Sequence, residues 1–315
     1  MNITVIEGAT LNHDDLNWGI IEKYGRLKVY DRTPAGLIEE RCADADIILS
    51  NKVPFTRQTL ERLPKLKMIN VMATGYNIID TEAAKEKRIV VCNIPGYGTA
   101  SVAQHSFALL LELTNHTGIH AQSVAQGGWQ KSPDWCYTIK PITELQGKIL
   151  GIVGLGNIGM RVAAIAKAFG MKIICCSNTK KETDLAMFTD INTLFARSDF
   201  ISLHCPLQPG NFQFINKALL QKMKASAMLI NTARGQLIHE QDLADALNND
   251  LIAGAALDVL STEPPLNDNP LLNAKNCIIT PHNAWISKEA RQRILNISAQ
   301  NIEAFIMNKP VNRVG

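Results

Sequence analysis

The sequence lacks several features that would assign it to a specialised class of protein. Its seven cysteines include no Cys-x-x-Cys pair, so we expect reduced thiols and no metal site. The most apolar stretch, residues 107–111, is far too short to span a bilayer. The N-terminus has neither a basic segment nor a long apolar run. We therefore expect no secretory signal and a cytoplasmic protein.

Strong charge of either sign is also missing. The net charge is +3, and the densest basic cluster is the pair Lys180 and Lys181. No basic stripe is interleaved with aromatic side chains, so we expect neither a nucleic acid nor a membrane surface as partner. With 315 residues, of which 46% are hydrophobic, the chain is long enough for two domains with buried cores.

Short β-rich runs alternate with helical patterns, which predicts an α/β fold with parallel sheets. In the first part, strands are expected at 3–6, 28–30, 47–49, 68–71 and 90–92, with helices such as 34–41 and 80–86. A turn-rich stretch, 93–98, suggests a crossover between domains. One long helix, about 99–126, and a loop at 127–141 are expected to follow.

A second α/β series begins at Lys148. Its expected strands are 149–153, 172–176, 200–203, 227–230, 253–257 and 278–279, and a final helix covers about 287–308. The pattern fits two architectures: two domains laid end to end, or one in which the last helix returns to the first domain.

Gly154, Gly156 and Gly159 form a Gly-x-Gly-x-x-Gly sequence between a buried strand and a helical pattern. The first glycine allows a tight turn, the second lets the backbone approach a pyrophosphate, and the third lets helix and strand pack closely. The N–H groups at the start of the helix then face the phosphates. This strand–turn–helix context predicts dinucleotide binding.

The second strand of this series ends without the acidic residue that binds the ribose of NAD. It runs instead into Ser177, Asn178, Thr179 and Lys180. A carboxylate would repel a 2′-phosphate by roughly 4 kcal/mol at about 4 Å and an effective dielectric of about 20, so its absence permits NADP(H) as well as NAD(H). Ser177 and Asn178 can equally bond a ribose hydroxyl, and the lysine can be solvated surface.

Arg234, Glu263 and His282 each follow a predicted strand of the second series. Histidine titrates near neutral pH and can pass a proton to a ketone oxygen, and a hydrogen-bonded glutamate would fix its tautomer and favour its charged form. An arginine can bind a carboxylate at two points. Alone, each residue is more often structural or solvated, but their joint placement favours reduction of a 2-keto acid. Among the other histidines only His204 is a rival, and we interpret it as a cofactor-side loop residue.

These motifs are part of a resemblance that covers essentially the whole chain. The sequence resembles the D-isomer-specific 2-hydroxyacid dehydrogenases, and within them the glycerate dehydrogenase (hydroxypyruvate reductase) group. Further motifs that carry the resemblance are Asn-Lys-Val-Pro at 51–54, Ala-Thr-Gly-Tyr-Asn at 73–77, Ser-Val-Ala-Gln-His at 101–105, His-Cys-Pro-Leu at 204–207 and Asn-Thr-Ala-Arg-Gly at 231–235.

The resemblance implies two Rossmann-like or flavodoxin-like domains with parallel sheets. A discontinuous substrate domain would comprise residues 1–98 and 287–315, and a dinucleotide-binding domain residues 99–286. It also implies an active cleft between the domains, a homodimer formed around the nucleotide domain, and NAD(H) or NADP(H) as the cofactor.

The resemblance assigns roles residue by residue. Arg234, Glu263 and His282 match the substrate arginine, the histidine partner and the acid–base residue. Substrate-binding roles fall on Asn51, Val53, Thr74, Gly75 and Arg234. Cofactor-binding roles fall on Gly154, Gly156, Asn157, Ile158, Gly159, Ser177, Asn178, Thr179, Lys180, Cys205, Pro206, Thr232, Ala233, Asp258 and His282. The sequence departs from the family at Ser177, where many members have Asp, and at Asn283, where an apolar residue is common.

We therefore expect reduction of hydroxypyruvate or glyoxylate to D-glycerate or glycolate. One alternative is another D-2-hydroxyacid dehydrogenase, specific for lactate or phosphoglycerate. A second is a cofactor-sensing binding protein, because corepressors related to this family share its architecture.

Overall fold

The computed structural model describes residues 1–178 and 183–315, which form two compact units. Met1–Gly98 and Trp285–Gly315 make up the first unit, and Thr99–Ala284 the second. Each unit contains one parallel β-sheet, so the predicted α/β class is confirmed. Within the described ranges, no helix is long and apolar enough to cross a membrane.

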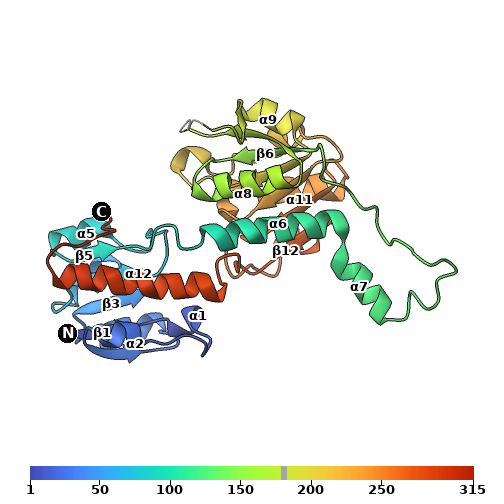
Figure 1. Cartoon of the computed structure of the whole chain (residues 1–315). Helices are drawn as coiled ribbons and strands as arrows, with labels where there is room; N and C mark the ends of the chain where they lie inside the picture. The colour runs from blue at the N-terminus through green and yellow to red at the C-terminus, as the bar shows by residue number, and fades with distance from the viewer. Residues whose placement is uncertain (179–182) are drawn as a thin grey trace. The chain divides into compact units, whose positions relative to one another are not determined.

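The sheet of the first unit has the strand order β2-β1-β3-β4-β5, and all its pairs are parallel. Its strands are β1 (Asn2–Val5), β2 (Arg26–Val29), β3 (Ile47–Ser50), β4 (Met68–Val71) and β5 (Val90–Cys92). The central strands β3 and β4 are buried along their whole length, because helices cover both faces of a parallel sheet. Figure 1 shows this sheet beside its C-terminal helix.

Short helices connect these strands, and one long helix completes the unit. They are α1 (Gly8–Leu11), α2 (Gly19–Glu22), η1 (Ala35–Leu37), α3 (Ile38–Cys42), α4 (Arg57–Glu61), α5 (Thr81–Glu86) and α12 (Lys288–Ile306). Polar side chains mark their starts: Asp80 accepts a hydrogen bond from Ala83 N, and Ser287 from Ala290 N. Such N-caps satisfy backbone donors that have no partner inside the helix.

Helix α12 belongs to the first unit although more than half of the chain separates it from β5. Its Ile294, Leu295 and Ile302 are fully buried in the same apolar cluster as β1 and β3. At its start, Arg291 binds both carboxylate oxygens of Asp15 at 2.6 and 2.8 Å. This guanidinium lowers the pKa of Asp15 to about 2.

A buried amide network fastens the same helix to the sheet edge. Asn301 Nδ2 donates to Asn70 Oδ1 at 2.8 Å and to Asn93 O at 3.0 Å, while Asn301 Oδ1 accepts from Asn312 Nδ2 at 2.8 Å. Asn70 in turn donates to Ser298 Oγ at 2.9 Å. Each of these buried groups therefore has a partner, as a stable interior requires.

The sheet of the second unit has the order β12-β11-β10-β9-β6-β7-β8, again with parallel pairs only. Its strands are β6 (Ile149–Val153), β7 (Lys172–Cys176), β8 (Met187–Phe188), β9 (Phe200–Leu203), β10 (Met228–Asn231), β11 (Gly254–Leu257) and β12 (Cys277–Ile279). From β6 the strands are added toward one edge of the sheet, as β7 and β8. From β9 onward they are added on the other side of β6, as β9, β10, β11 and β12. This reversal places a topological switch point between β6 and β9, where open α/β sheets bind ligands.

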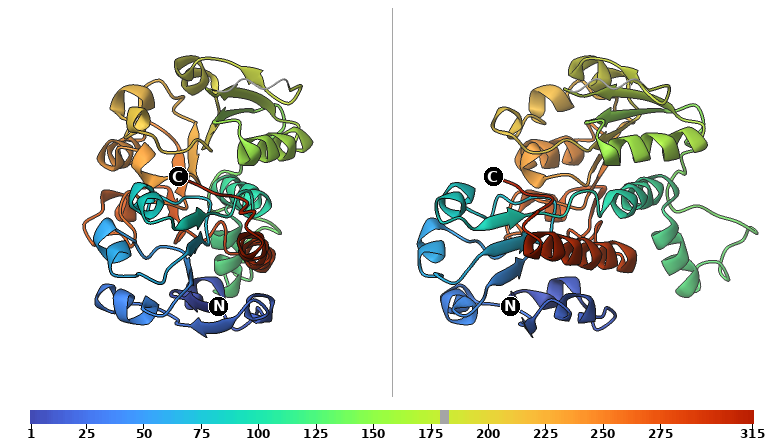
Figure 2. Two further views of the ribbon diagram at one scale, coloured as in Figure 1. Left: turned by 90° about the vertical axis from the view of Figure 1, so that its left-hand side faces the viewer. Right: turned by 60° about the vertical axis from the view of Figure 1, so that its left-hand side comes forward.

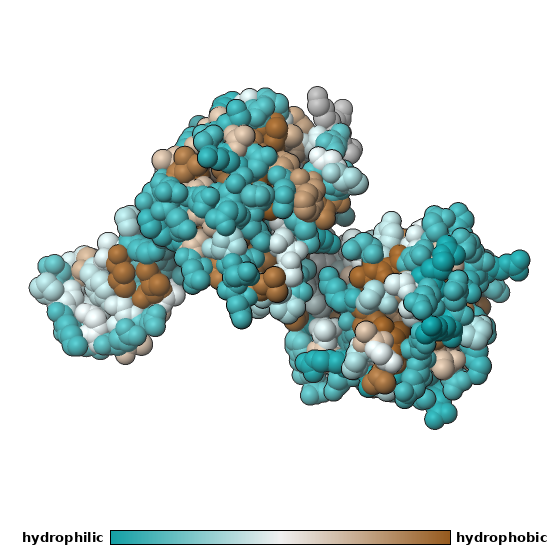
Figure 3. Space-filling model, turned by 180° about the vertical axis from the view of Figure 1, so that it is seen from behind, coloured by the Kyte–Doolittle hydropathy of each residue, from teal (hydrophilic) through white to brown (hydrophobic). Residues whose placement is uncertain are grey.

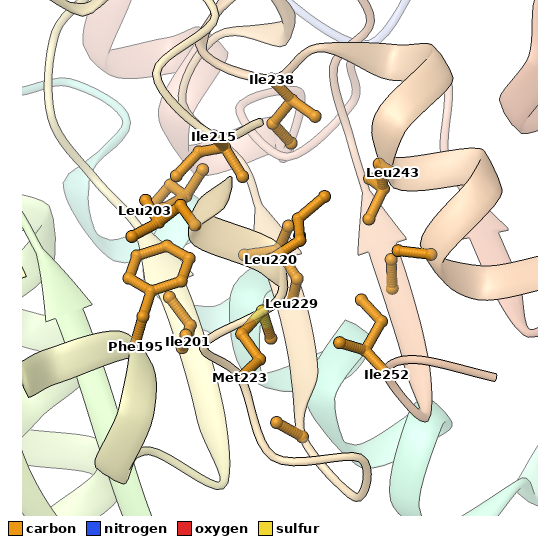
Figure 4. Close-up of a cluster of buried hydrophobic side chains, with 14 of the residues drawn as sticks. Phe195, Ile201, Leu203, Ile215, Leu220, Met223, Leu229, Ile238, Leu243 and Ile252 are labelled. Atoms are coloured by element: carbon orange, nitrogen blue, oxygen red, sulfur yellow. The ribbon is translucent and has the colours of Figure 1, made fainter. Parts of the chain in front are cut away.

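Helices cover both faces of this sheet (Figures 1 and 2). The helices of this unit are α6 (Thr99–Asn115), α7 (Thr117–Ala125), α8 (Asn157–Ala168), α9 (Ile191–Arg197), η2 (Pro209–Asn211), α10 (Lys217–Leu220), η3 (Gly235–Leu237), α11 (Glu240–Asn248) and η4 (Pro270–Asn273). Helix α7 has no buried residue and extends away from the sheet (Figure 1). Helices α6 and α8 share one apolar core with the sheet, and α9 to α11 share the other. Figure 4 shows Phe195, Leu220, Leu229 and Leu243 converging in the second core.

Two sequence expectations need correction. The predicted single helix at 99–126 is two helices, because His116 adopts a left-handed φ of 53° that breaks the ladder between α6 and α7. Strand β8 was missed because it has only two residues and pairs on one side. The stretch 127–141 contains no helix or strand, as the sequence indicated.

The amide network gives a test of how α12 is held. Replacing Asn301 by Ala leaves the buried oxygens Asn70 Oδ1 and Asn93 O without this donor, which should lower the free energy of unfolding by roughly 1–3 kcal/mol. Urea denaturation measures the change. The matched control is Asn296→Ala on the exposed side of the same helix, which should change stability by less than about 0.5 kcal/mol. Equal losses in both variants would contradict the network's role.

Candidate active site and nucleotide cradle

The glycine loop after β6 has the geometry of a phosphate-binding turn. Gly154 has a φ of 94°, and a Cβ there would lie 2.6 Å from Cys205 N in the loop after β9. A Cβ on Gly159 would overlap the carbonyl oxygen of Gly154. A Cβ on Gly156, by contrast, would meet no atom of the described residues within 4 Å. The first and third glycines thus serve packing, and the second faces open space.

The start of α8 adds favourable electrostatics to that space. The helix begins at Asn157, and Gly156 is its N-cap in an extended conformation. Asn157 is exposed, while Ile158 packs against the apolar core behind the helix. Because a twelve-residue helix presents N–H groups and partial positive charge at its start, these residues fit the pyrophosphate of a dinucleotide.

The coenzyme-specificity residues are only partly described. Ser177 and Asn178 directly follow β7, the strand next to β6, so they lie at the same carboxyl edge as the glycine loop. Neither side chain is acidic. Thr179 and Lys180 lie outside the described residues.

His204, Cys205 and Pro206 follow β9 on the other side of the switch point. Burial lowers the pKa of His204 to about 4, and its Nε2 lies 2.8 Å from Ser202 Oγ. This imidazole is therefore neutral near pH 7 and ill suited to donate a proton. Burial raises the pKa of Cys205 to about 11, which keeps its thiol protonated.

The structure brings His282 and Glu263 together. His282 lies three residues beyond β12, and its Nδ1 is 2.6 Å from Glu263 Oε2. The other oxygen of Glu263 accepts a hydrogen bond from Leu260 N at 3.1 Å. A carboxylate at Nδ1 selects the tautomer with a proton on that nitrogen, so Nε2 is the atom that can exchange a proton with a ligand.

The loop that carries His282 is held by Asp258, at the end of β11. Buried Asp258 accepts hydrogen bonds from Thr280 Oγ1 at 2.6 Å and from the backbone N–H groups of Asn283 and Ala284 at 2.9 Å. Burial alone would raise the pKa of Asp258, but hydrogen bonds from His105, Thr280 and the backbone outweigh it and lower the pKa.

His282 itself adopts a left-handed φ of 50°. This conformation is uncommon outside glycine and costs of order 1–3 kcal/mol. It is maintained because the backbone N–H of His282 donates to Asp258 O at 2.8 Å, which fixes the turn.

Sequence reasoning missed His105 because only histidines after predicted strands were considered. His105 lies on α6, and its Nε2 is 3.1 Å from Thr280 Oγ1 and 3.4 Å from Asp258 Oδ1. Helical spacing places it on the same face as Val102 and Leu109, which are both buried. That spacing was the available signal that His105 faces the sheet.

Arg234 stands on the neighbouring loop, after β10. Buried Asn231 shapes this turn by accepting from Ala233 N at 2.9 Å and donating to Arg234 O at 2.9 Å. The Arg234 guanidinium is exposed and donates to Ala233 O at 2.7 Å. Thr232 is buried, and its hydroxyl lies 2.9 Å from Ser106 Oγ.

Close packing joins the Arg234 loop to the Glu263 loop. A Cβ on Gly235 would overlap the backbone of Leu260, and Gln236 Nε2 donates to Ser261 O at 2.8 Å. The residue after Arg234 therefore has to be glycine for the two loops to approach.

The remaining candidates belong to the first unit. Asn51 and Val53 follow β3, and Thr74 and Gly75 follow β4, so all four lie at the carboxyl edge of that sheet. Asn51 and Val53 are buried, while Thr74 is exposed.

Comparisons with known proteins show similarity over the whole chain. The family description "D-isomer specific 2-hydroxyacid dehydrogenase, NAD binding domain" matches residues 107–284. A protein of Blautia hydrogenotrophica named hydroxypyruvate reductase is 47% identical over 320 residues, covering 100% of this chain and 99% of that protein. A glycerate dehydrogenase of Methylorubrum extorquens is 42% identical, covering 90% and 89%.

Solved structures share the architecture as well. An acyclic imino acid reductase in complex with NADPH and D-Arg superposes with a TM-score of 0.88 at 33% identity, covering 100% of both chains.

The glycine geometry predicts two different outcomes for two similar substitutions. Gly156→Ala should leave the melting temperature unchanged but raise the Kd for NADH about tenfold or more, because its methyl group occupies the space meant for the pyrophosphate. Gly159→Ala should lower the melting temperature as well, because its methyl group overlaps Gly154 O. Fluorescence titration and thermal unfolding measure the two effects.

Gly210→Ala is the matched control, since a Cβ there also meets nothing within 4 Å among the described residues. It should change neither quantity. An unchanged Kd in Gly156→Ala would contradict the assignment of this loop as the cradle.

Proposed function

The chain belongs to the D-isomer-specific 2-hydroxyacid dehydrogenase family, and we propose that it reduces hydroxypyruvate or glyoxylate to the D-2-hydroxy acid. Membership makes it an oxidoreductase that uses NAD(H) or NADP(H). The names of the relatives, hydroxypyruvate reductase and glycerate dehydrogenase, support this choice of substrate.

The observation that carries the proposal is the 2.6 Å contact between His282 Nδ1 and Glu263 Oε2. Glu263 stabilises the protonated imidazole and orients it, so that Nε2 can give its proton to the ketone oxygen. When bound, the reduced nicotinamide supplies the hydride that reaches the ketone carbon. In the reverse direction, neutral His282 takes the proton of the alcohol.

Arg234 is proposed to bind the substrate carboxylate. Its guanidinium is exposed at the carboxyl edge of the sheet, on a turn that Asn231 holds in place. A guanidinium can pair with both oxygens of a carboxylate. Asn51, Val53, Thr74 and Gly75 are proposed as further substrate-binding residues.

Cofactor binding is assigned to the switch point of the 99–284 unit. The proposed contacts are Gly154, Gly156, Asn157, Ile158 and Gly159 for the pyrophosphate, Ser177 and Asn178 for the ribose, Cys205 and Pro206 for the adenosine half, and Thr232, Ala233, Asp258 and His282 for the nicotinamide. Because Ser177 stands where a carboxylate would repel a 2′-phosphate, we propose that NADPH is accepted alongside NADH.

A single panel tests substrate and coenzyme together. Hydroxypyruvate, glyoxylate, pyruvate and 3-phosphohydroxypyruvate are each combined with NADH and NADPH, and kcat/KM is compared. Highest values for hydroxypyruvate or glyoxylate support the proposal, whereas pyruvate or the phosphorylated acid would indicate a lactate- or phosphoglycerate-type enzyme. Cofactor binding without oxidation by any of the four acids would indicate a sensor.

Removal of the proton donor should separate chemistry from binding. We expect His282→Ala to lower kcat by about 10²- to 10⁴-fold, because general acid catalysis contributes that much. The Kd for NADH should change far less, because the proposed pyrophosphate, ribose and adenosine contacts remain. Glu263→Gln should lower kcat less, because the imidazole and its Nε2 remain. Stopped-flow turnover and cofactor titration measure the split, and an unaltered kcat in His282→Ala would reject its role.

We also propose that the protein is a homodimer formed by the 99–284 unit. Large apolar side chains are exposed along the segment after α7: Trp129 is 53% exposed, Trp135 85% and Ile142 60%. Figure 3 shows some apolar surface on the lobe formed by α7 and this segment, at the left of the view. Exposed apolar patches of this kind mark interaction sites. Light scattering after size exclusion should give twice the mass of the chain, which is 34.7 kDa, and a monomer mass would reject the dimer.

A further inference from the structure

A buried carboxylate in the first unit has no part in the chemistry described so far. Glu7 follows β1, and only 8% of it is exposed. Its Oε2 accepts hydrogen bonds from Ser50 Oγ at 3.1 Å, from Asn51 N and Lys52 N at 2.8 Å, and from Val53 N at 2.9 Å. Three successive backbone N–H groups thus converge on one oxygen, an arrangement that binds anions.

Glu7 lies at the carboxyl edge of the sheet, where its position relates it to ligand binding. Strands β1 and β3 are neighbours, with β2 on one side and β4 and β5 on the other. The crevice at the carboxyl ends of β1 and β3 is therefore the topological switch point of this sheet, where open α/β sheets bind ligands. Here a carboxylate of the chain itself fills the anion-binding concavity.

Further hydrogen bonds extend from the Glu7 contacts to the next loop. Asn51 Nδ2 donates to Met72 O at 3.2 Å, where the loop after β4 begins. In that loop, Thr74 O accepts from Asn93 Nδ2 at 2.8 Å, and Thr74 Oγ1 donates to Ile94 O at 2.9 Å. Contiguous bonds thus connect the loops after β1, β3, β4 and β5.

We propose that Glu7 is a positioning residue for binding of the 2-keto acid. Its carboxylate fixes the backbone of residues 51–53 and, through Asn51, the loop that carries Thr74 and Gly75. Charge-assisted hydrogen bonds are roughly twice as strong as neutral ones, so an ionised side chain holds these loops in one conformation before substrate arrives. This inference rests on the proposed function, because Asn51, Val53, Thr74 and Gly75 are substrate-binding residues only within it.

The test compares two substitutions at Glu7 in the full chain. In Glu7→Ala the loops lose their common acceptor, so KM for hydroxypyruvate should rise about tenfold or more, which corresponds to a loss of about 1.4 kcal/mol. The value of kcat at saturation and the Kd for NADH should stay close to those of the wild type. Glu7→Gln keeps a carbonyl oxygen as acceptor but loses the charge, so its KM should lie between those of the wild type and Glu7→Ala.

Asp46→Ala is the matched control. Asp46 also joins β1 to β3, since its Oδ2 accepts from Asn2 N at 2.8 Å and its Oδ1 pairs with Lys67 Nζ at 2.8 Å. It precedes β3 and therefore lies at the opposite edge of the sheet. Its removal should cost stability but leave KM unchanged.

Hydrogen exchange provides a readout that needs no turnover. The amides of Asn51, Lys52 and Val53 should exchange faster in Glu7→Ala than in the wild type, and at the wild-type rate in Asp46→Ala. If Glu7→Ala fails to fold, the intermediate KM of Glu7→Gln decides. The positioning role would be overturned if both Glu7 variants had the same KM as Asp46→Ala, or if only kcat fell.

Failure of the proposed function looks different. In that case the wild-type protein itself prefers pyruvate or 3-phosphohydroxypyruvate, or turns over none of the four keto acids. An active wild type whose KM survives both Glu7 substitutions removes only the inference about Glu7.

Discussion

The buried carboxylate of Asp258 fixes the geometry of the candidate active site in the 99–284 unit. It collects a hydroxyl hydrogen bond from Thr280 and backbone donors from Asn283 and Ala284, and its own carbonyl accepts from His282 N. Without this carboxylate, the N–H groups of Asn283 and Ala284 would lose their acceptor at about 1–3 kcal/mol each, and the loop that contains the left-handed His282 would lose its side-chain support. The 2.6 Å contact with Glu263 depends on that backbone.

Much of the fold could be predicted from the sequence because the signals are local. Runs rich in Val and Ile mark strands that are buried on both faces, and Met68–Val71, Lys172–Cys176 and Phe200–Leu203 have the bounds that these runs indicated. The break at His116 could not be predicted, since no proline or glycine precedes it in the helix and a single residue in a left-handed conformation makes the turn.

The candidate site residues also differ in whether a local sequence signal marks them. His282, Glu263 and Arg234 could be proposed from the sequence because each follows a predicted strand. The contacts that hold the surrounding loops join distant parts of the chain: His105 meets Thr280 across 175 residues, and in the first unit Glu7 meets Asn51 across 44. Asp258 and Glu7 nevertheless share one arrangement, in which a carboxylate within two residues of the end of a parallel strand accepts hydrogen bonds from the N–H groups of a neighbouring loop.

The return of α12 to the first unit constrains the order in which the two units can complete their folding. Domains generally fold as units while the nascent chain leaves the ribosome, beginning with the N-terminal one. Here the first 98 residues emerge early, yet their core lacks Ile294, Leu295 and Ile302 until α12 has been translated. The 99–284 unit is synthesised completely before α12. The part of the chain that is synthesised first therefore reaches its native packing last, and the sheet face that α12 covers lacks this helix until then.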